Sequence, residues 1–169
     1  SARRPDGARR GPAESFELLN RGKQSVVLDL HEQSGRRELY ELIQQADIVL
    51  EASRPRALRH MGIIAEDLVR ENSGLSWVSI TGYGRREPQG NWIAYGDDAA
   101  VAAGLSAIIH EMTDQWLICG DAIADPLTGL HAALAGWASW LAGGGQLLEL
   151  SLVETVRHCI SCTAPVDND

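Results

Sequence analysis

An aspartate-proline pair at the start of a long apolar segment is the strongest candidate for chemistry in this sequence. Asp125 precedes Pro126, and leucine and tryptophan recur at steps of three and four in residues 127–141, the spacing of one helix face. Because proline is favoured at the first helical position, Asp125 is expected at or beside the N-cap. Free backbone N–H groups and the helix dipole would favour its charged form. Such a carboxylate can serve as a nucleophile or simply cap the helix.

Other acidic and sulfur-containing residues offer weaker alternatives. Asp121 lies four residues earlier and is a rival nucleophile or a turn residue. Asp97 and Asp98 form an acidic pair, which fits either a general base or a helix N-cap. Cys159 and Cys162 form a C-x-x-C pair, but no second pair accompanies them. A zinc site needs four ligands, so we expect no metal.

The bulk composition excludes several classes of function. The chain has 169 residues, 44% of them hydrophobic, which is enough for one core of ordinary size. Its net charge of -8 argues against a nucleic-acid partner. Its apolar runs fall short of the roughly 18 residues that a membrane span needs. Three cysteines are too few for a disulfide framework. We therefore expect a cytoplasmic protein that binds neither nucleic acid nor a membrane.

The elements that must position these residues alternate between strand and helix in the first half of the chain. Apolar, β-branched runs predict strands, and helical spacing of leucine and isoleucine predicts the helices between them. Such alternation implies parallel pairing, and continuously apolar strands imply burial on both faces. Residues 1–17 are polar and rich in glycine and proline, and predict a flexible N-terminal segment. The predicted strands are 25–30, 46–50 and 75–80, and the helices are 35–45, 54–61 and 64–71.

The second half is more helical. The pattern predicts helices over 98–109, 126–141 and 153–162 and a strand over 147–152, with three glycines after the long helix. The fold class is therefore α/β, with a partial doubly wound (Rossmann-like) parallel sheet followed by a long helix and further α/β elements. A doubly wound sheet usually carries a glycine-rich turn after its first strand. Since none follows a strand here, we expect the chain to begin after the opening β-α-β unit.

Four sequence blocks, taken in order and spacing, carry a family resemblance. They are LNRGKQS at 19–25, ADIVLE at 46–51 with RP at 54–55 and HMG at 60–62, VSITGYG at 78–84 with GDD at 96–98, and IADPLTGL at 123–130 with GQ at 145–146 and LSLVE at 150–154. Together they resemble the class III CoA-transferase family, which includes formyl-CoA transferases, carnitine CoA-transferases and α-methylacyl-CoA racemases. The resemblance covers residues 14–157, so 18–169 is interpreted as part of the family's large domain.

The resemblance implies a reaction and a nucleophile. Members move CoA between carboxylic acids through an aspartyl-CoA thioester, and the aspartate precedes a T-G-L sequence at the start of a long helix. The matching residue here is Asp125. The implied substrates are an acyl-CoA and a carboxylic acid, without a metal. Family subunits form interlocked homodimers.

The resemblance also implies the positions that bind coenzyme A. Cations, hydrogen-bond donors and an apolar slot suit its phosphates and adenine, and Arg54 could pair a phosphate bidentately. His60 stands where some members have arginine, and a histidine is mostly uncharged at neutral pH. The implied CoA-binding residues are Leu19, Asn20, Arg21, Ser53, Arg54, Ala57 and His60.

Two alternatives to CoA transfer are open. One is an acyl-CoA racemase or dehydratase-type member of the same family. The racemases carry histidine-aspartate where this chain has Asp97 and Asp98, which argues against racemisation. The other is a non-catalytic, truncated or split-enzyme fragment that needs a partner chain. A family subunit is much longer than 169 residues, and its C-terminal half is expected to be absent here, so this chain could be inactive in isolation.

Overall fold

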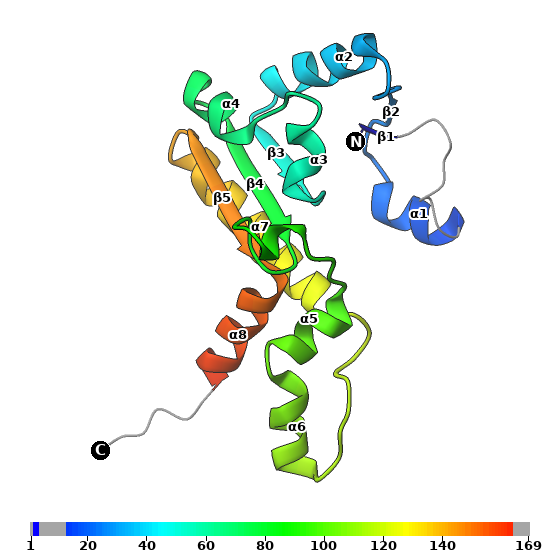
Figure 1. Cartoon of the computed structure of the whole chain (residues 1–169), viewed down its shortest axis with the longest axis vertical. Coiled ribbons are helices and arrows are strands. Elements are labelled where there is room, and N and C mark those ends of the chain that lie inside the picture. The colour runs from blue at the N-terminus through cyan, green and yellow to red at the C-terminus, as the bar shows by residue number, and fades with distance from the viewer. Residues whose placement is uncertain (1, 4–12, 164–169) are drawn as a thin grey trace. The chain divides into compact units, whose positions relative to one another are not determined.

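The computed structural model describes residues 2–3 and 13–163 and divides the chain into two compact units, residues 1–46 and 47–169 (Figure 1). In the first unit, strand β1 (Ala2–Arg3) pairs in parallel with β2 (Val26–Val27). The unit also holds helices α1 (Ala13–Asn20) and α2 (Gln33–Gln44). Helix α1 begins within the segment predicted to be loop, and the strand predicted over 25–30 is only two residues long. Residues 4–12 of the predicted flexible segment lie outside the described residues.

The second unit is built on a parallel sheet of three strands in the order β3 (Ile48–Glu51), β4 (Ser76–Thr81), β5 (Gln146–Ser151). Helices α3 (Pro55–Arg59) and α4 (Ala65–Glu71) connect β3 to β4. Between β4 and β5 lie the 3-10 helix η1 (Gln89–Asn91) and helices α5 (Gly96–Ala102), α6 (Leu105–Thr113) and α7 (Ala124–Leu141). Helix α8 (Leu152–Thr163) follows β5. The predicted α/β class with a parallel sheet is confirmed.

One predicted helix is two helices in the structure. The Ala-rich run predicted over 98–109 is broken at Gly104, whose φ of +98° places it in the left-handed region. Glycine adopts this conformation without the penalty that a Cβ brings. Helices α5 and α6 therefore run in different directions from this residue (Figure 1).

Helix α7 packs on the sheet through its small residues. The buried positions include Thr128, Ala132, Gly136 and Ser139. A Cβ added to Gly136 would lie 3.2 Å from Val78 Cγ2, and the Ser139 hydroxyl is 2.8 Å from that of Ser76. Small side chains allow the helix and β4 to approach closely, which brings these polar and apolar contacts within reach.

The large apolar face of α7 is exposed. Leu130 is 70% exposed, Leu134 71% and Trp137 63%. Their spacing identified a common helix face, but spacing does not say which face meets the sheet. The opposite face, with smaller side chains, makes that contact because it fits closer to β4. Within the described part of the chain, no helix has both the length and the apolar character for crossing a membrane.

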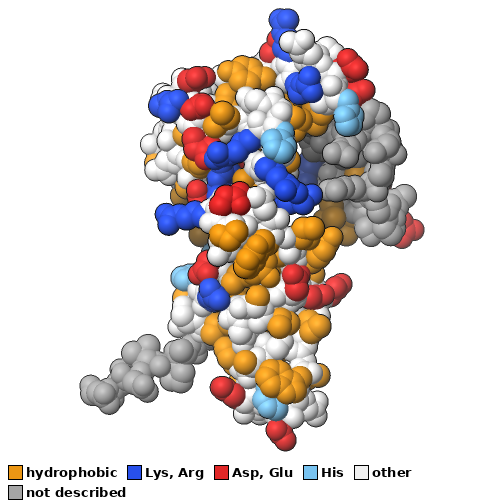
Figure 2. Space-filling model, viewed as in Figure 1, with side chains coloured by type: hydrophobic (Ala, Val, Ile, Leu, Met, Phe, Trp, Pro, Cys, Tyr) orange, Lys and Arg blue, Asp and Glu red, His pale blue; other side chains and the backbone are white. Residues whose placement is uncertain are grey.

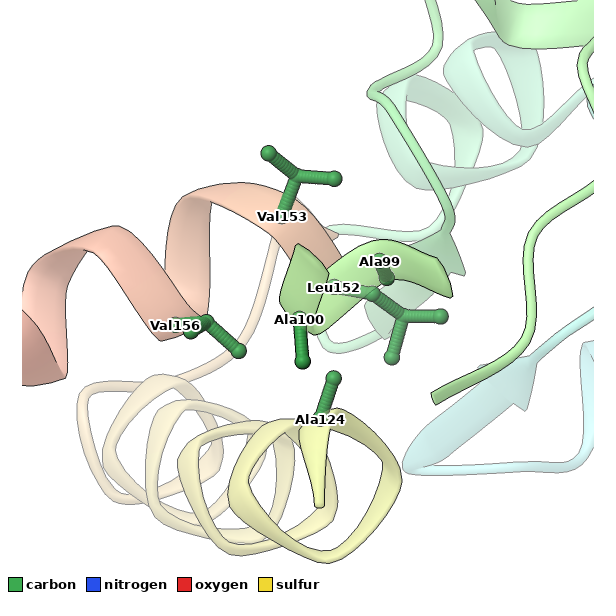
Figure 3. Packing of buried hydrophobic residues seen from close by; sticks show 6 residues of the cluster. All are labelled: Ala99, Ala100, Ala124, Leu152, Val153 and Val156. Atoms are coloured by element: carbon green, nitrogen blue, oxygen red, sulfur yellow. The ribbon is translucent and has the colours of Figure 1, made fainter. Parts of the chain in front are cut away.

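An apolar cluster joins helices α5, α7 and α8. Its buried members come from α5, α7 and α8. Ala100 and Ala124 point toward each other, with Leu152 beside them, whereas Val153 points away from them (Figure 3). Ala124 is fully buried in this cluster, where it meets Ala99 and Ala100 of α5 and Leu152 at the start of α8. The cluster therefore fixes the first turn of α7, which is the turn that carries Asp125. Its buried members are Ala99, Ala100, Ala124, Leu152, Val153 and Val156.

Candidate active site

Asp125 is the second residue of α7, so the helix begins two residues before the predicted start at Pro126. Its backbone N–H donates to the Ala122 carbonyl at 2.9 Å, which closes the turn into the helix. The residue is exposed. Among the described residues, none donates a hydrogen bond to its carboxylate. Asp125 therefore does not act as an N-cap, and its oxygens are accessible to a ligand.

The backbone that precedes Asp125 is held by the start of α5. Asp97 Oδ1 accepts a hydrogen bond from the Ala122 N–H at 2.8 Å. Ala122 has a φ of +50°, an uncommon conformation for a residue with a Cβ. A Cβ on Gly96 would lie 2.4 Å from the Ala122 carbonyl oxygen, so this approach requires glycine. Asp97 and Gly96 together lock the turn that leads into α7.

Asp98 has a local structural partner of its own. Its Oδ1 accepts a hydrogen bond from the Tyr95 N–H at 2.6 Å, which satisfies a donor at the start of α5. The sequence left open whether the pair Asp97 and Asp98 holds a general base or a cap. In the structure, each of the two side chains has an oxygen that accepts from backbone. Asp98 stabilises the start of α5, and Asp97 ties α5 to the turn before α7.

The electrostatic setting of Asp125 differs from the expectation for a helix start. Partial burial raises the pKa of Asp125, and the nearby negative charges of Asp97 and Asp98 raise it further. The helix dipole was expected to favour the ionised form, but desolvation and like charge act in the opposite direction. The three aspartates thus form a carboxylate cluster in which charge on Asp125 is disfavoured.

This shift predicts that Asp125→Asn stabilises the fold at neutral pH. Asp125 has a higher pKa in the folded than in the unfolded state, so its contribution to stability is present below its ordinary pKa and lost as the pH rises through the folded-state value. Removing the charge should therefore raise the melting temperature at pH 7. The difference should vanish below about pH 3, where the carboxyl is protonated in both states. Melting curves of both proteins from pH 3 to 8 test this, and an equal shift at every pH would contradict it.

The predicted CoA-binding positions of the second unit lie around α3. Ser53 and Arg54 follow β3, Ala57 lies within α3, and His60 ends it. Arg54 and His60 are exposed, and Figure 2 shows Lys and Arg side chains gathered over this helix. A cationic, accessible surface suits a phosphate-bearing ligand.

The remaining predicted positions belong to the first unit. Leu19 and Asn20 end α1, and Arg21 follows them. Leu19 is exposed, and so is Arg21. The Asn20 side chain donates to the Phe16 carbonyl at 2.9 Å, and the Lys23 ammonium donates to the Leu19 carbonyl at 2.7 Å. These bonds fix the end of the helix and leave the Leu19 and Arg21 side chains available.

Asp125 and the α3 segment share one edge of the sheet. Ser53 follows the carboxyl end of β3, and Ala124 packs against Leu152, which follows the carboxyl end of β5. The strands are parallel, so these ends meet at the same edge (Figure 1). Ligands of open α/β sheets bind outside the carboxyl ends of the strands. The sheet therefore presents the candidate nucleophile and the candidate CoA-binding segment on the side where a ligand is expected.

Gly129 leaves open space beside Asp125. It lies four residues after Asp125, and residues at this spacing are neighbours on one helix face. A Cβ on Gly129 would meet no atom within 4 Å. No role was predicted for Gly129 from the sequence, although a glycine inside a helix is itself a signal of close approach by another group.

A separate pocket lies between η1, α5 and α8. It has a volume of about 400 Å³ and is lined by residues that include Tyr83, Trp92 and Arg157. Asp125 is not among its lining residues, nor is any residue of 53–60. Asp125 is itself exposed at the start of α7.

Comparison with known proteins places this arrangement in a family. The chain is 30% identical to the succinate–glutarate CoA-transferase of Agrobacterium fabrum over 143 residues, which cover 82% of the chain and 36% of the relative. It is also 30% identical to a formyl-CoA:oxalate CoA-transferase of Escherichia coli over 147 residues, which cover 85% of the chain and 35% of the relative. The chain thus spans about a third of the length of these relatives.

Solved structures share the fold. A CAIB/BAIF family protein from Brucella suis matches 96% of the chain and 48% of its own length, with a TM-score of 0.82 and 26% identity. A hypothetical protein from Mycobacterium tuberculosis matches 95% of the chain with a TM-score of 0.78 and 23% identity. The family model described as CoA-transferase family III matches residues 1–167. The chain therefore belongs to CoA-transferase family III.

Proposed function

We propose that the protein transfers CoA between carboxylic acids through a covalent intermediate on Asp125. The observation that carries the proposal is an exposed carboxylate, free of hydrogen bonds from the described residues, in the first turn of α7 at the carboxyl edge of the sheet. The open space beside Gly129 gives an approaching thioester room. Membership of the CoA-transferase family supports the reaction class.

The proposed reaction needs four displacements at carbonyl carbons. An Asp125 oxygen attacks the thioester carbonyl and expels the CoA thiolate, which leaves a mixed anhydride. The thiolate attacks the aspartyl carbonyl of this anhydride and expels the first carboxylate, which leaves an aspartyl-CoA thioester. The incoming carboxylate attacks that thioester and expels the thiolate again. The thiolate then attacks the new acyl carbonyl, which forms the new acyl-CoA and restores Asp125.

The electrostatic environment of Asp125 suits this series of displacements. Its neighbours Asp97 and Asp98 disfavour its charge, so attack that neutralises the carboxylate relieves repulsion. In the second unit, Arg54 would pair a phosphate of CoA, and Ser53, Ala57 and His60 lie in the same segment. The family resemblance implies that Leu19, Asn20 and Arg21 of the first unit are also CoA-binding positions. The family resemblance further implies that the protein acts as a homodimer.

Racemisation is less well supported. It requires a base that can move an α-proton, and the position that holds histidine in the racemases holds Asp97 here. One oxygen of Asp97 already accepts a hydrogen bond from the Ala122 N–H. We therefore assign Asp97 to holding the turn before α7.

Trapping of the intermediate tests the proposed function. The protein is incubated with an acyl-CoA and hydroxylamine, digested and mapped by mass spectrometry. Hydroxylamine should convert activated Asp125 to a hydroxamate, and the same treatment without acyl-CoA should leave it unmodified. If CoA-binding protein gives no adduct at Asp125, or gives one at Asp121, the assignment of the nucleophile is wrong.

A further inference from the structure

A buried arginine lies on the face of the sheet opposite α7. The side chain of Arg85 is only 6% exposed. Its Nη1 donates to Ser79 Oγ at 2.9 Å. Side chains alternate along a strand, and Ser76 and Val78 face α7, so Ser79 faces the other way. Arg85 follows β4 and folds back over it to reach this face.

Three carboxylates surround this one guanidinium. Glu66 Oε1 accepts from Arg85 Nη2 at 2.9 Å. Glu51 Oε2 lies 3.8 Å from Nη1, and Glu149 Oε1 lies 3.6 Å from Nε. The strand register explains the second and third contacts, because Glu51 and Glu149 pair with Ser79 from either side. Removing the cation would leave three like charges close together, one of them buried.

Two of these carboxylates also hold the candidate CoA-binding segment, residues 53–60. Glu51 Oε1 accepts from Ser53 Oγ at 2.7 Å, at the start of the segment. Glu66 Oε1 accepts from Arg59 Nη2 at 2.6 Å, at its end. Both ends of the segment are therefore tied, each through one glutamate, to the same arginine.

The charge state of Glu66 agrees with this arrangement. Burial by itself raises the pKa of Glu66, but a hydrogen bond from its own backbone N–H, the hydrogen bond and charge of Arg85, and the charge of Arg59 outweigh burial and lower it. Glu66 is thus held as the carboxylate that bridges the two arginines.

We propose that Arg85 is a positioning residue that fixes segment 53–60 for coenzyme A binding. The inference rests on the proposed function, because it is CoA that the segment is expected to bind. Arg85 itself faces the sheet and is buried, so it acts through Glu51 and Glu66. Losing it should weaken CoA binding and leave the chemistry at Asp125 nearly unchanged.

Hydrogen exchange and CoA binding together test the proposal. In Arg85→Gln, the amides of residues 57–62, which bond within this segment, should exchange at least ~10-fold faster, and the dissociation constant for CoA should rise by a similar factor. Arg86→Gln is the matched control, because Arg86 is adjacent and exposed, and it should change neither. Turnover at saturating CoA thioester should stay within about threefold of the wild type, which a general loss of structure would not permit.

Two milder variants guard against a folding failure of Arg85→Gln. Ser53→Ala removes the hydrogen bond to Glu51 at the start of the segment, and Glu66→Gln weakens the contact with Arg59 at its end. Each variant should accelerate exchange of the amides of residues 57–62. Unchanged exchange in folded Arg85→Gln, or in both milder variants, would overturn the proposal. A wild-type protein that binds no CoA would remove the proposed function, while the exchange comparison still decides whether Arg85 orders the segment.

Discussion

Asp125→Asn is expected to abolish CoA transfer while leaving the fold intact. Asparagine has the same size, but its amide oxygen is a poor nucleophile, and neither the anhydride nor the aspartyl-CoA thioester can form. We expect the rate of transfer to fall by more than about 10³-fold, which corresponds to about 4 kcal/mol of lost transition-state stabilisation. Transfer of CoA from an acyl-CoA to an isotopically labelled carboxylic acid, followed by chromatography, measures it.

The control for this variant is Asp121→Asn. Asp121 lies four residues earlier and is exposed, so it is the rival nucleophile nearest in sequence. Its substitution should retain most of the wild-type rate. The reverse pattern, with transfer lost in Asp121→Asn and kept in Asp125→Asn, would move the nucleophile to Asp121.

Gly129→Leu is expected to reduce CoA transfer by about 10²-fold, because displacing reacting groups by about 1 Å has an effect of this order. The added side chain would occupy the space one helical turn from Asp125, where a Cβ meets no atom. Leucine favours helix over glycine, so the melting temperature should not fall. Steady-state transfer rates and melting curves of the same preparations separate obstruction from unfolding.

Two controls test whether the loss of activity in Gly129→Leu is a local steric effect. Gly129→Ala adds a single methyl group and should retain more activity than the leucine variant. Ala133→Leu places the same larger side chain on another exposed position of α7, one turn further from Asp125, and should leave transfer unaffected. Equal losses in Gly129→Leu and Ala133→Leu would show that the effect is not local to the nucleophile.

The sequence predicted the sheet because its signals are local. Strands β3, β4 and β5 are apolar runs between helical patterns, and their predicted ranges agree with the structure to within two residues. The start of α7 was also close, because proline and aspartate mark helix starts. The break at Gly104 was missed, since an alanine-rich run on both sides fits one continuous helix equally well.

The surroundings of Asp125 depend on contacts that are distant in sequence. Asp97 reaches Ala122 across 25 residues, and the charges of Asp97 and Asp98 raise the pKa of Asp125, against the effect expected of the helix start. Arg85 was not singled out, because an arginine in a polar loop after a strand usually faces solvent. Its burial depends on two strands that place Glu51 and Glu149 on either side of Ser79.

Because α7 packs closely on β4, a change at the Gly136 end of the helix can alter the position of the proposed nucleophile, Asp125, at its start. Gly136 is eleven residues from Asp125, about 16 Å along the helix axis. A Cβ added to Gly136 would lie 3.2 Å from Val78 Cγ2, so a larger side chain has no room there. A larger side chain at Gly136 would push that end of α7 away from β4. The apolar cluster around Ala124 would hold the first turn in place, so the tilt of the helix would change. Substitutions at residues that never touch the proposed substrate could therefore change the angle at which Asp125 would meet it.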